Sequence, residues 1–238
     1  NGSCRIKAVG DRAKTVIWGA SDPTSADGTG CGPAAVRCVL ASNGSSQFCV
    51  QGLTLKGGRV AYSEKYSDGD AYRGGCFRVA AAGSGSVFLD CAITDGCAGR
   101  GAAGFGGCIV RCVVTNNVVA GTGNAIVRGG TAIACLFADN DARTSFLIGQ
   151  DQILANCTLV GNRMSTTGQY RYDVTNNGSR HFNCVFGVTE NSLRTYESQA
   201  NESAYGCLSN HGSDVPATSV RDDPCFADAA HGDYRLLG

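Results

Sequence analysis

The sequence has little net charge, few prolines and no long apolar run. Its 238 residues carry 20 Lys and Arg against 20 Asp and Glu, so the formal net charge is zero. Because there is no basic block, nothing favours nucleic acid or an anionic membrane surface as a partner. No stretch approaches the roughly 20 apolar residues of a membrane-spanning helix. With one Met, one Trp and four Pro, the chain is characterised instead by its 34 Gly and 14 Cys.

Abundant glycine with little proline favours many tight turns between short strands. Fourteen cysteines favour an oxidising compartment, although a cysteine inside a repeat can also be a small buried hydrophobe. The chain starts at Asn1 without a signal peptide. We therefore expect a mature or trimmed piece of a longer, exported precursor.

Six cysteines recur in one local context at intervals of about 21 to 27 residues. Each is followed by a short apolar segment, as in Asn156-Cys157-Thr158-Leu159. Such a period predicts a solenoid, in which each repeat buries its apolar face against its neighbours. The six are Cys91, Cys112, Cys135, Cys157, Cys184 and Cys207.

Each repeat contains three short strand signals, and no stretch from 75 to 190 has a helical apolar period. The chain is therefore predicted to be all-β. One set of strands is 76–79, 125–127, 146–148 and 172–174; a second is 87–89, 108–110, 131–133, 152–154 and 179–182; the third contains the six cysteines. Earlier strand signals at 5–9, 15–18, 36–40 and 48–50 are irregularly spaced, with a Gly-rich loop at 20–33.

Strand alternation predicts the contents of the core. If each repeat cysteine points inward, so does the residue two positions later, which is always apolar: Ile93, Val114, Phe137, Leu159 and Phe186. Asn117, Asn140 and Asn162 follow at corresponding turns and are predicted to form a hydrogen-bonded asparagine ladder.

The six cysteines are then predicted to stack as buried, reduced thiols, because parallel neighbours in register point the same way and suit a disulfide dihedral poorly. Any disulfides should lie among the remaining cysteines: Cys4, Cys31, Cys38, Cys49, Cys76, Cys97, Cys108 and Cys225.

Several segments resemble one family. The unit Asn-Cys-Thr-Leu-Val-Gly-Asn at 156–162, the opening segment 6–19, the segment 50–58 and the closing segment 223–236 are similar to bacterial right-handed parallel β-helix repeat proteins. These are the pectate-lyase-like secreted and surface proteins. The resemblance covers nearly the whole chain. It implies a single-stranded right-handed parallel β-helix of about seven to nine coils with an inward cysteine ladder, and it supports export.

Members of this family include polysaccharide lyases, glycosidases and adhesins, so the resemblance leaves the activity open. Lyases of this fold use an Arg or Lys base and often Ca²⁺ held by carboxylates. No carboxylate occupies an outward position of the cysteine strands, and Asp222-Asp223 is interpreted as a turn. Cysteines about 22 residues apart are no zinc pattern. We expect no catalytic residues, no metal site and no cofactor, with Ca²⁺ at Asp68-Gly69-Asp70 as the one alternative.

Two surfaces are candidates for binding. Loops that follow the cysteine strands should emerge along one edge, and their tyrosines suit sugar rings or a protein partner; alternatively, they only anchor the loops. The candidates are Tyr62, Tyr66, Asp68, Asp70, Tyr72, Arg73, Tyr170, Arg171, Tyr172 and Tyr196. An outward apolar stripe, which needs a cover from the chain or from a partner, is expected at Val113, Leu136, Val160 and Val185.

We therefore expect one domain, with a β-helix over 1–207 and a capping tail over 208–238. The predicted function is a secreted or cell-surface structural or binding module that recognises a polysaccharide or a cell-surface protein. The alternatives are a polysaccharide lyase or glycoside hydrolase, and a self-assembling structural protein that associates end to end through exposed strand edges.

Overall fold

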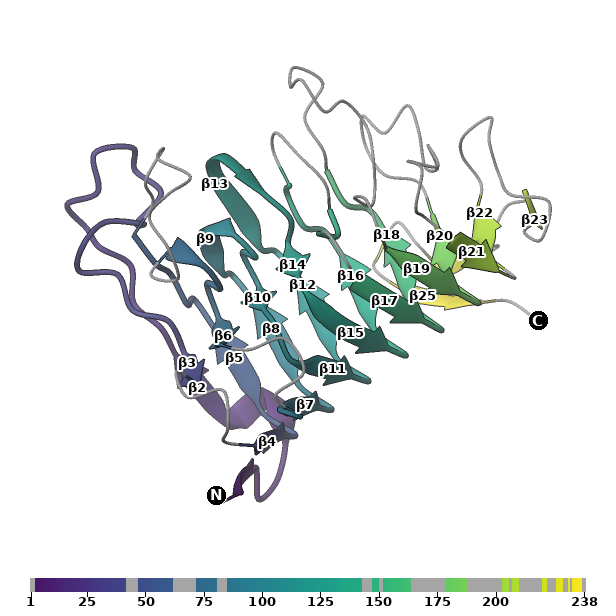
Figure 1. The fold of residues 1–238 in the computed structure, drawn as a ribbon, viewed down its shortest axis with the longest axis horizontal. Helices are drawn as coiled ribbons and strands as arrows, with labels where there is room; N and C mark the ends of the chain where they lie inside the picture. Colours follow the sequence, from purple (N-terminus) through teal and green to yellow (C-terminus); the bar gives the residue numbers. More distant parts are fainter. Residues whose placement is uncertain are drawn as a thin grey trace.

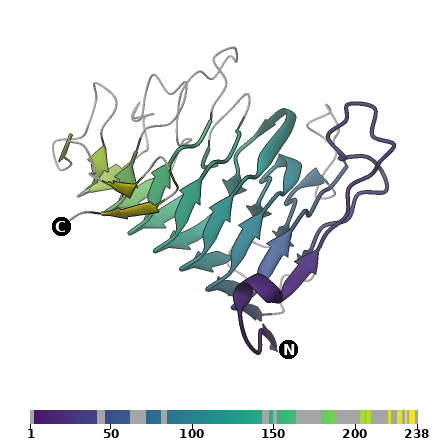
Figure 2. The same ribbon diagram turned by 180° about the vertical axis from the view of Figure 1, so that it is seen from behind.

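The structure is a computed structural model, and the elements that it describes are almost all β-strands (Figures 1 and 2). It describes residues 3–41, 47–61, 72–80, 85–142, 147–149, 152–163, 179–187, 203–205, 207–209, 220–221, 226–228, 231 and 233–236. Within these ranges, helical conformation is confined to a 3₁₀ turn, Arg12–Lys14, and to single 3₁₀ residues at Tyr72 and His231. The prediction of an all-β chain is confirmed. No helix in the described part of the chain is long and apolar enough to cross a membrane.

Three parallel sheets run along the molecule. The first has the order β1-β4-β7-β11-β15-β17-β19-β21: Cys4–Lys7, Phe48–Gln51, Val87–Leu89, Cys108–Val110, Gly130–Ile133, Gln152–Ala155, Arg180–Phe182 and Ser203–Tyr205. The second has the order β2-β5-β8-β12-β16-β18-β20-β22-β23: Val16–Trp18, Thr54–Lys56, Ala92–Thr94, Val113–Thr115, Leu136–Ala138, Thr158–Val160, Val185–Phe186, Leu208–Ser209 and Val220–Arg221. The third has the order β14-β10-β6-β3: Val127–Arg128, Gly104–Phe105, Phe77–Val79 and Val39–Ala41.

The chain alternates between these sheets. It passes from a strand of the first sheet to one of the second and, up to β14, on to the third before it returns. Two further strands, β9 (Cys97–Arg100) and β13 (Val118–Asn124), pair in parallel beside the third sheet. The arrangement is compatible with a solenoid. Near the C-terminus, β24 (Phe226–Asp228) and β25 (Asp233–Leu236) form an antiparallel pair.

The irregular spacing of the first strand signals does not interrupt the array. β1 pairs with β4, β2 with β5 and β3 with β6, each in parallel register. The irregular spacing arises because the connecting segments differ in length while the strands keep their places. Of the strands expected at 146–148 and 172–174, the structure describes Leu147 and Ile148, which are both buried, and Ile148 forms a single bridge to Val127.

The second sheet places the repeat cysteines in the core. All six have exposed fractions of 3% or less, and the inward row two positions later, from Ile93 to Phe186, is equally buried. Each thiol from Cys91 to Cys184 lies 3.3–3.4 Å from the carbonyl oxygen two residues earlier, to which it can donate. None of the thiols from Cys91 to Cys184 forms a disulfide. Hydrogen bonding to Cys112, together with burial, raises the pKa of Cys91 well above the ordinary thiol value.

A left-handed backbone residue precedes these cysteines and turns the chain from the first sheet into the second. Its φ lies between 50° and 55° in five repeats. Asn, Asp and Gly tolerate this conformation, whereas other residues are strained by roughly 1–2 kcal/mol. The row consists of Asp90, Arg111, Ala134, Asn156 and Asn183, with Gly52 before Leu53 at φ 69°.

The asparagine ladder lies at the opposite end of the second-sheet strands, where the chain leaves the sheet. Asn117, Asn140 and Asn162 have exposed fractions of 1% or less. The Nδ2 group of Asn140 donates to Val114 O and to Asn162 Oδ1, both at 2.9 Å. Its Oδ1 accepts from the backbone N–H and from Nδ2 of Asn117, at 3.0 and 2.9 Å. Each amide thus satisfies backbone groups of its own and of neighbouring repeats.

We predict that Ala134→Asn stabilises the protein. Ala134 is exposed and has φ 52°, where asparagine is less strained, so the free energy of unfolding should rise by about 0.5–1 kcal/mol. Chemical denaturation measures the change. The control is Ala155→Asn on β17, where the backbone φ is not positive. This substitution should not raise the free energy of unfolding. An equal effect at both positions would contradict the assignment of strain to Ala134.

We predict that Asn140→Ala lowers the free energy of unfolding by about 3 kcal/mol or more, because it leaves a buried N–H of Asn117 and a buried carbonyl of Val114 without their side-chain partner. The control Thr115→Ala, on the half-exposed face of β12, should change it by less than about 0.5 kcal/mol. Similar losses for the two variants in urea denaturation would contradict a structural role for the ladder.

Candidate functional site

Most of the tyrosine-rich candidates fall outside the described residues. These are Tyr62, Tyr66, Asp68, Asp70, Tyr170, Arg171, Tyr172 and Tyr196. Tyr72 and Arg73 are described, and both are half-buried where the chain returns to the array before β6. Arg73 forms a parallel bridge with Arg100, the last residue of β9. This pairing brings two arginines that are distant in sequence onto one edge of the molecule.

The third sheet adds two more arginines to the same edge. Its register aligns Leu40, Arg78, Phe105 and Arg128 in one row. The alternate row, which includes Phe77 and Val127, is buried at 2% exposure or less, so strand alternation directs the arginine row away from the core. We call Arg73, Arg78, Arg100 and Arg128, together with Phe105, the arginine edge.

Phe105 and two glycines hold the arginine edge in place. The guanidinium carbon of Arg73 lies 4.9 Å from the centroid of the Phe105 ring, a cation–π contact. Gly74 has φ 73°, and a Cβ there would approach Phe77 O to 2.1 Å and Arg78 Cβ to 3.0 Å. A Cβ on Gly149 would lie 2.8 Å from Arg128 Cγ, so the Arg128 side chain lies over that glycine. The absence of a side chain at Gly74 and Gly149 therefore leaves room for the neighbouring Arg78 and Arg128.

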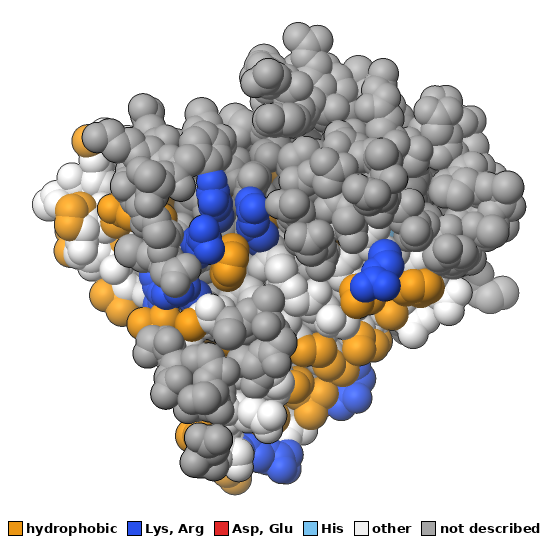
Figure 3. Space-filling model, viewed as in Figure 1, with side chains coloured by type: hydrophobic (Ala, Val, Ile, Leu, Met, Phe, Trp, Pro, Cys, Tyr) orange, Lys and Arg blue, Asp and Glu red, His pale blue; other side chains and the backbone are white. Residues whose placement is uncertain are grey.

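The arginine edge gathers four positively charged side chains on neighbouring strands. Figure 3 shows Lys and Arg side chains gathered over the region of β6, β10 and β14, and no Asp or Glu colour appears among the described residues on that face. Arg78 has an exposed fraction of 7%, and the other three arginines are half-buried. Arginine side chains gathered on one edge favour a bound anion, because a guanidinium group binds carboxylate, sulfate or phosphate with bidentate geometry.

The predicted apolar stripe needs a correction. Val113 pairs with Leu136, Leu136 with Thr158 and Thr158 with Val185, so Val160 does not belong to this row. Val160 lies two positions after Thr158 and pairs with Ala138. Both Thr158 and Val160 face outward, and the sequence alone could not show which of them is in register with Leu136. Val160 is buried, with an exposed fraction of 4%.

A longer apolar row, which the sequence reasoning missed, lies on the outer face of the first sheet. Leu89, Val110, Ile133, Ala155 and Phe182 pair in register on successive strands. They are half-buried, except Phe182 with an exposed fraction of 36%. Figure 3 shows hydrophobic side chains gathered over β11 and β15. In the sequence these residues directly follow the inward residues of the first sheet, such as Phe88 and Ile109. This alternation of two apolar rows was the signal that could have revealed the outer row.

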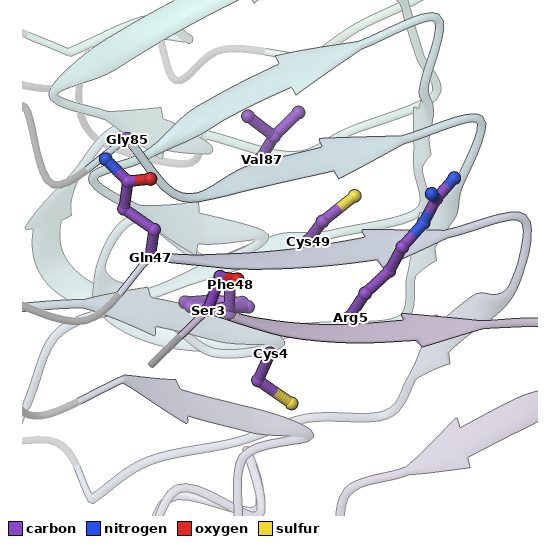
Figure 4. Close-up of a pocket in the computed structure, with 8 residues that line it drawn as sticks. All are labelled: Ser3, Cys4, Arg5, Gln47, Phe48, Cys49, Gly85 and Val87. Carbon is purple, nitrogen blue, oxygen red and sulfur yellow. The ribbon is translucent and has the colours of Figure 1, made fainter. Parts of the chain in front are cut away.

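A pocket of about 370 Å³ lies at the edge formed by β1, β4 and β7 (Figure 4). Cys49 and Arg5 are register partners on its wall, and Cys49 pairs in turn with Val87. Arg5 donates a hydrogen bond to Gln51. The remaining lining residues are Ser3, Cys4, Gln47, Phe48 and Gly85. The pocket lacks a carboxylate or histidine, so its described lining offers no acid–base pair.

The other candidate chemistry is not assembled in the described part of the chain. No group of three or more His, Cys, Asp or Glu residues there could hold a metal ion. His181 is a core residue with an exposed fraction of 1% and packs edge-on against Phe186 at 5.7 Å between ring centroids. Burial lowers the pKa of His181 to about 4, so it is neutral at physiological pH.

Comparison of the chain with protein-family models, with curated proteins and with solved structures gives no match.

We predict that His181 makes the protein acid-sensitive. Its pKa is lowered to about 4 in the folded state, so the unfolded state binds more protons between pH 6.5 and 4 and stability falls as the pH decreases through this range. The loss should approach 3 kcal/mol at pH 4. In His181→Leu, which matches its register partner Leu154, denaturation midpoints should lose most of this dependence. An unchanged profile would contradict burial of a neutral His181.

Proposed function

We propose that this protein is an exported or cell-surface binding module that recognises an acidic polysaccharide at the arginine edge. We further propose that its fold is a right-handed parallel β-helix of about seven to nine coils, as the family resemblance implies. The observation that carries the binding proposal is the placement of Arg73, Arg78, Arg100 and Arg128 on one edge of the molecule, with Arg73 stacked on Phe105.

The spacing of the arginine edge suits a linear polymer. Neighbouring parallel strands lie roughly 4.8 Å apart, so Arg78 and Arg128, with Phe105 between them, are separated by two strand spacings. A chain of acidic sugars repeats its charges on a similar scale. Guanidinium groups can bind each anion with two hydrogen bonds, and the Phe105 ring offers an apolar face to a sugar ring.

The tyrosine-rich segments extend this proposal. Tyr72 adjoins Arg73 at the arginine edge. The other tyrosine-rich segments also follow strands of the second sheet in the sequence; they contain Tyr62, Tyr66, Tyr170, Tyr172 and Tyr196. In this proposal they add stacking surfaces along the same ligand.

Two alternatives have specific support. The family resemblance implies that polysaccharide lyases of this fold use an Arg or Lys base, so the arginine edge also suits a lyase. End-to-end self-association is favoured by the exposed side chains of the first strand layer, where Ile6, Trp18 and Leu40 have exposed fractions of 44%, 64% and 53%. A monodisperse monomer at high concentration in light scattering would contradict self-association.

We predict that Arg73→Ala combined with Arg128→Ala weakens binding to polygalacturonate at least tenfold, because two charge-assisted contacts are lost. Isothermal titration calorimetry at several salt concentrations measures the loss, and the wild-type affinity should fall as salt rises. Neutral dextran should not bind.

Arg111→Ala is the matched control for charge. Arg111 lies at the corner between the first and second sheets and forms an ion pair with Asp90, with 2.7 Å between Nε and Oδ1. Its removal should change the affinity by less than twofold. Equal losses in the control and in the double variant, or no binding by the folded wild-type protein, would contradict the proposal.

A further inference from the structure

Two cysteines outside the ladder meet where the loop from 20 to 36 lies against the array. Cys31 comes from this loop, and Cys97 is the first residue of β9. Their exposed fractions are 5% and 2%, and with Ala120 they form a small apolar cluster separate from the main core. Residues 66 positions apart in sequence are thus held together in a shielded site.

The loop is organised so that Cys31 keeps this position. Ala20 and Val36 form an antiparallel bridge that closes the loop. Inside it, the buried carboxylate of Asp22 accepts hydrogen bonds from Thr24 N at 2.8 Å and from Ala34 N at 3.0 Å. The pKa of Asp22 is lowered by its hydrogen bonds from Thr24 and Ala34. The carboxylate therefore remains charged and holds the loop at neutral pH.

Arg59 connects the loop to the strand that carries Cys97. It forms a parallel bridge with Cys97, and its Nη1 donates to Thr29 O at 2.6 Å. The Oγ1 of Thr29 in turn accepts from Cys31 N at 3.1 Å. Hydrogen bonding from Cys97 lowers the pKa of Cys31 to about 7, with a smaller contribution from the Arg59 charge. The lowered pKa favours the thiolate of Cys31, which is the nucleophilic form.

A second thiol pair nearby differs in geometry. Cys38 N donates to Cys76 O at 3.1 Å, and the next residues, Val39 and Phe77, are register partners. Cys38 and Cys76 are therefore neighbours on parallel strands, like the ladder cysteines, and their side chains point the same way. This geometry suits a disulfide dihedral poorly. Cys31 approaches Cys97 from a loop and is free of this constraint.

We propose that Cys31 and Cys97 form a reversible disulfide that fastens the loop from 20 to 36 to β9, while Cys38 and Cys76 remain thiols. The oxidant is a small-molecule disulfide. The Cys31 thiolate attacks one of its sulfurs and releases one thiolate; the Cys97 thiolate then attacks the Cys31 sulfur of the mixed disulfide and releases the second. Two protein thiols are oxidised, one disulfide is reduced to two thiols, and the two protons pass to the released thiolates.

The test is refolding from denaturant in a buffer of reduced and oxidised glutathione, so that burial does not block the oxidant. Free thiols are then alkylated in denaturant, and the linked peptides are mapped by mass spectrometry. The proposal predicts that Cys31 and Cys97 are linked in the major species and that Cys38 and Cys76 are alkylated. Predominant linkage of Cys38 to Cys76, any other partner for Cys31, or alkylation of both Cys31 and Cys97 would overturn it.

A second measurement tests the effect on the folded protein. The disulfide closes a long loop of chain, so the oxidised protein should melt roughly 5–15 °C above the reduced protein. A reductant should reverse this difference, and Cys97→Ser should abolish it. Cys108→Ser, on the outer face of β11, is the control and should retain it. A shift of the same size in Cys97→Ser would also overturn the proposal.

Discussion

The in-register stacking of parallel strands is the constraint on which the rest of this structure depends. Neighbouring strands lie roughly 4.8 Å apart and keep equivalent residues side by side. Equivalent residues of successive repeats thus form a row along the molecule. All the residues of one row share the same environment, either buried or exposed, and must be compatible with it. The buried rows show this: the cysteines, the apolar row from Ile93 to Phe186 and the asparagines each occupy one line. Corner geometry is repeated too, with a left-handed residue before each ladder cysteine from Cys91 to Cys184.

The arginine edge lies where one of these rows changes composition. At the position of the asparagine ladder, the earlier repeats have Gly58 and Gly96. A Cβ on Gly58 would lie 2.5 Å from Gly75 O, and one on Gly96 would lie 2.4 Å from Ala102 O. Glycine therefore lets the chain pack closely here, beside the third sheet and β9 that carry the arginines and Cys97. From Asn117 onward the asparagine amide fills the equivalent place.

The periodic part of the structure could be predicted from the sequence. The cysteine interval, the strands of the first two sheets and the inward row follow from regular spacing and alternation. Non-periodic contacts could not be predicted in the same way. Arg73 and Arg100 meet because connecting segments of different length return to one edge, and Cys31 reaches Cys97 from a loop outside the repeat. The register error at Val160 shows the limit of alternation, which gives the face of a residue but not its row.

The central functional claim is that the arginine edge binds an acidic polysaccharide without cleaving it. The most direct test is one incubation of the protein with polygalacturonate, in which binding is measured by titration and unsaturated or shortened products are measured over many hours, with and without added Ca²⁺. The account predicts saturable, salt-sensitive binding and an unchanged polymer. Steady product formation that disappears in the Arg73→Ala Arg128→Ala variant would contradict it and establish a lyase or hydrolase.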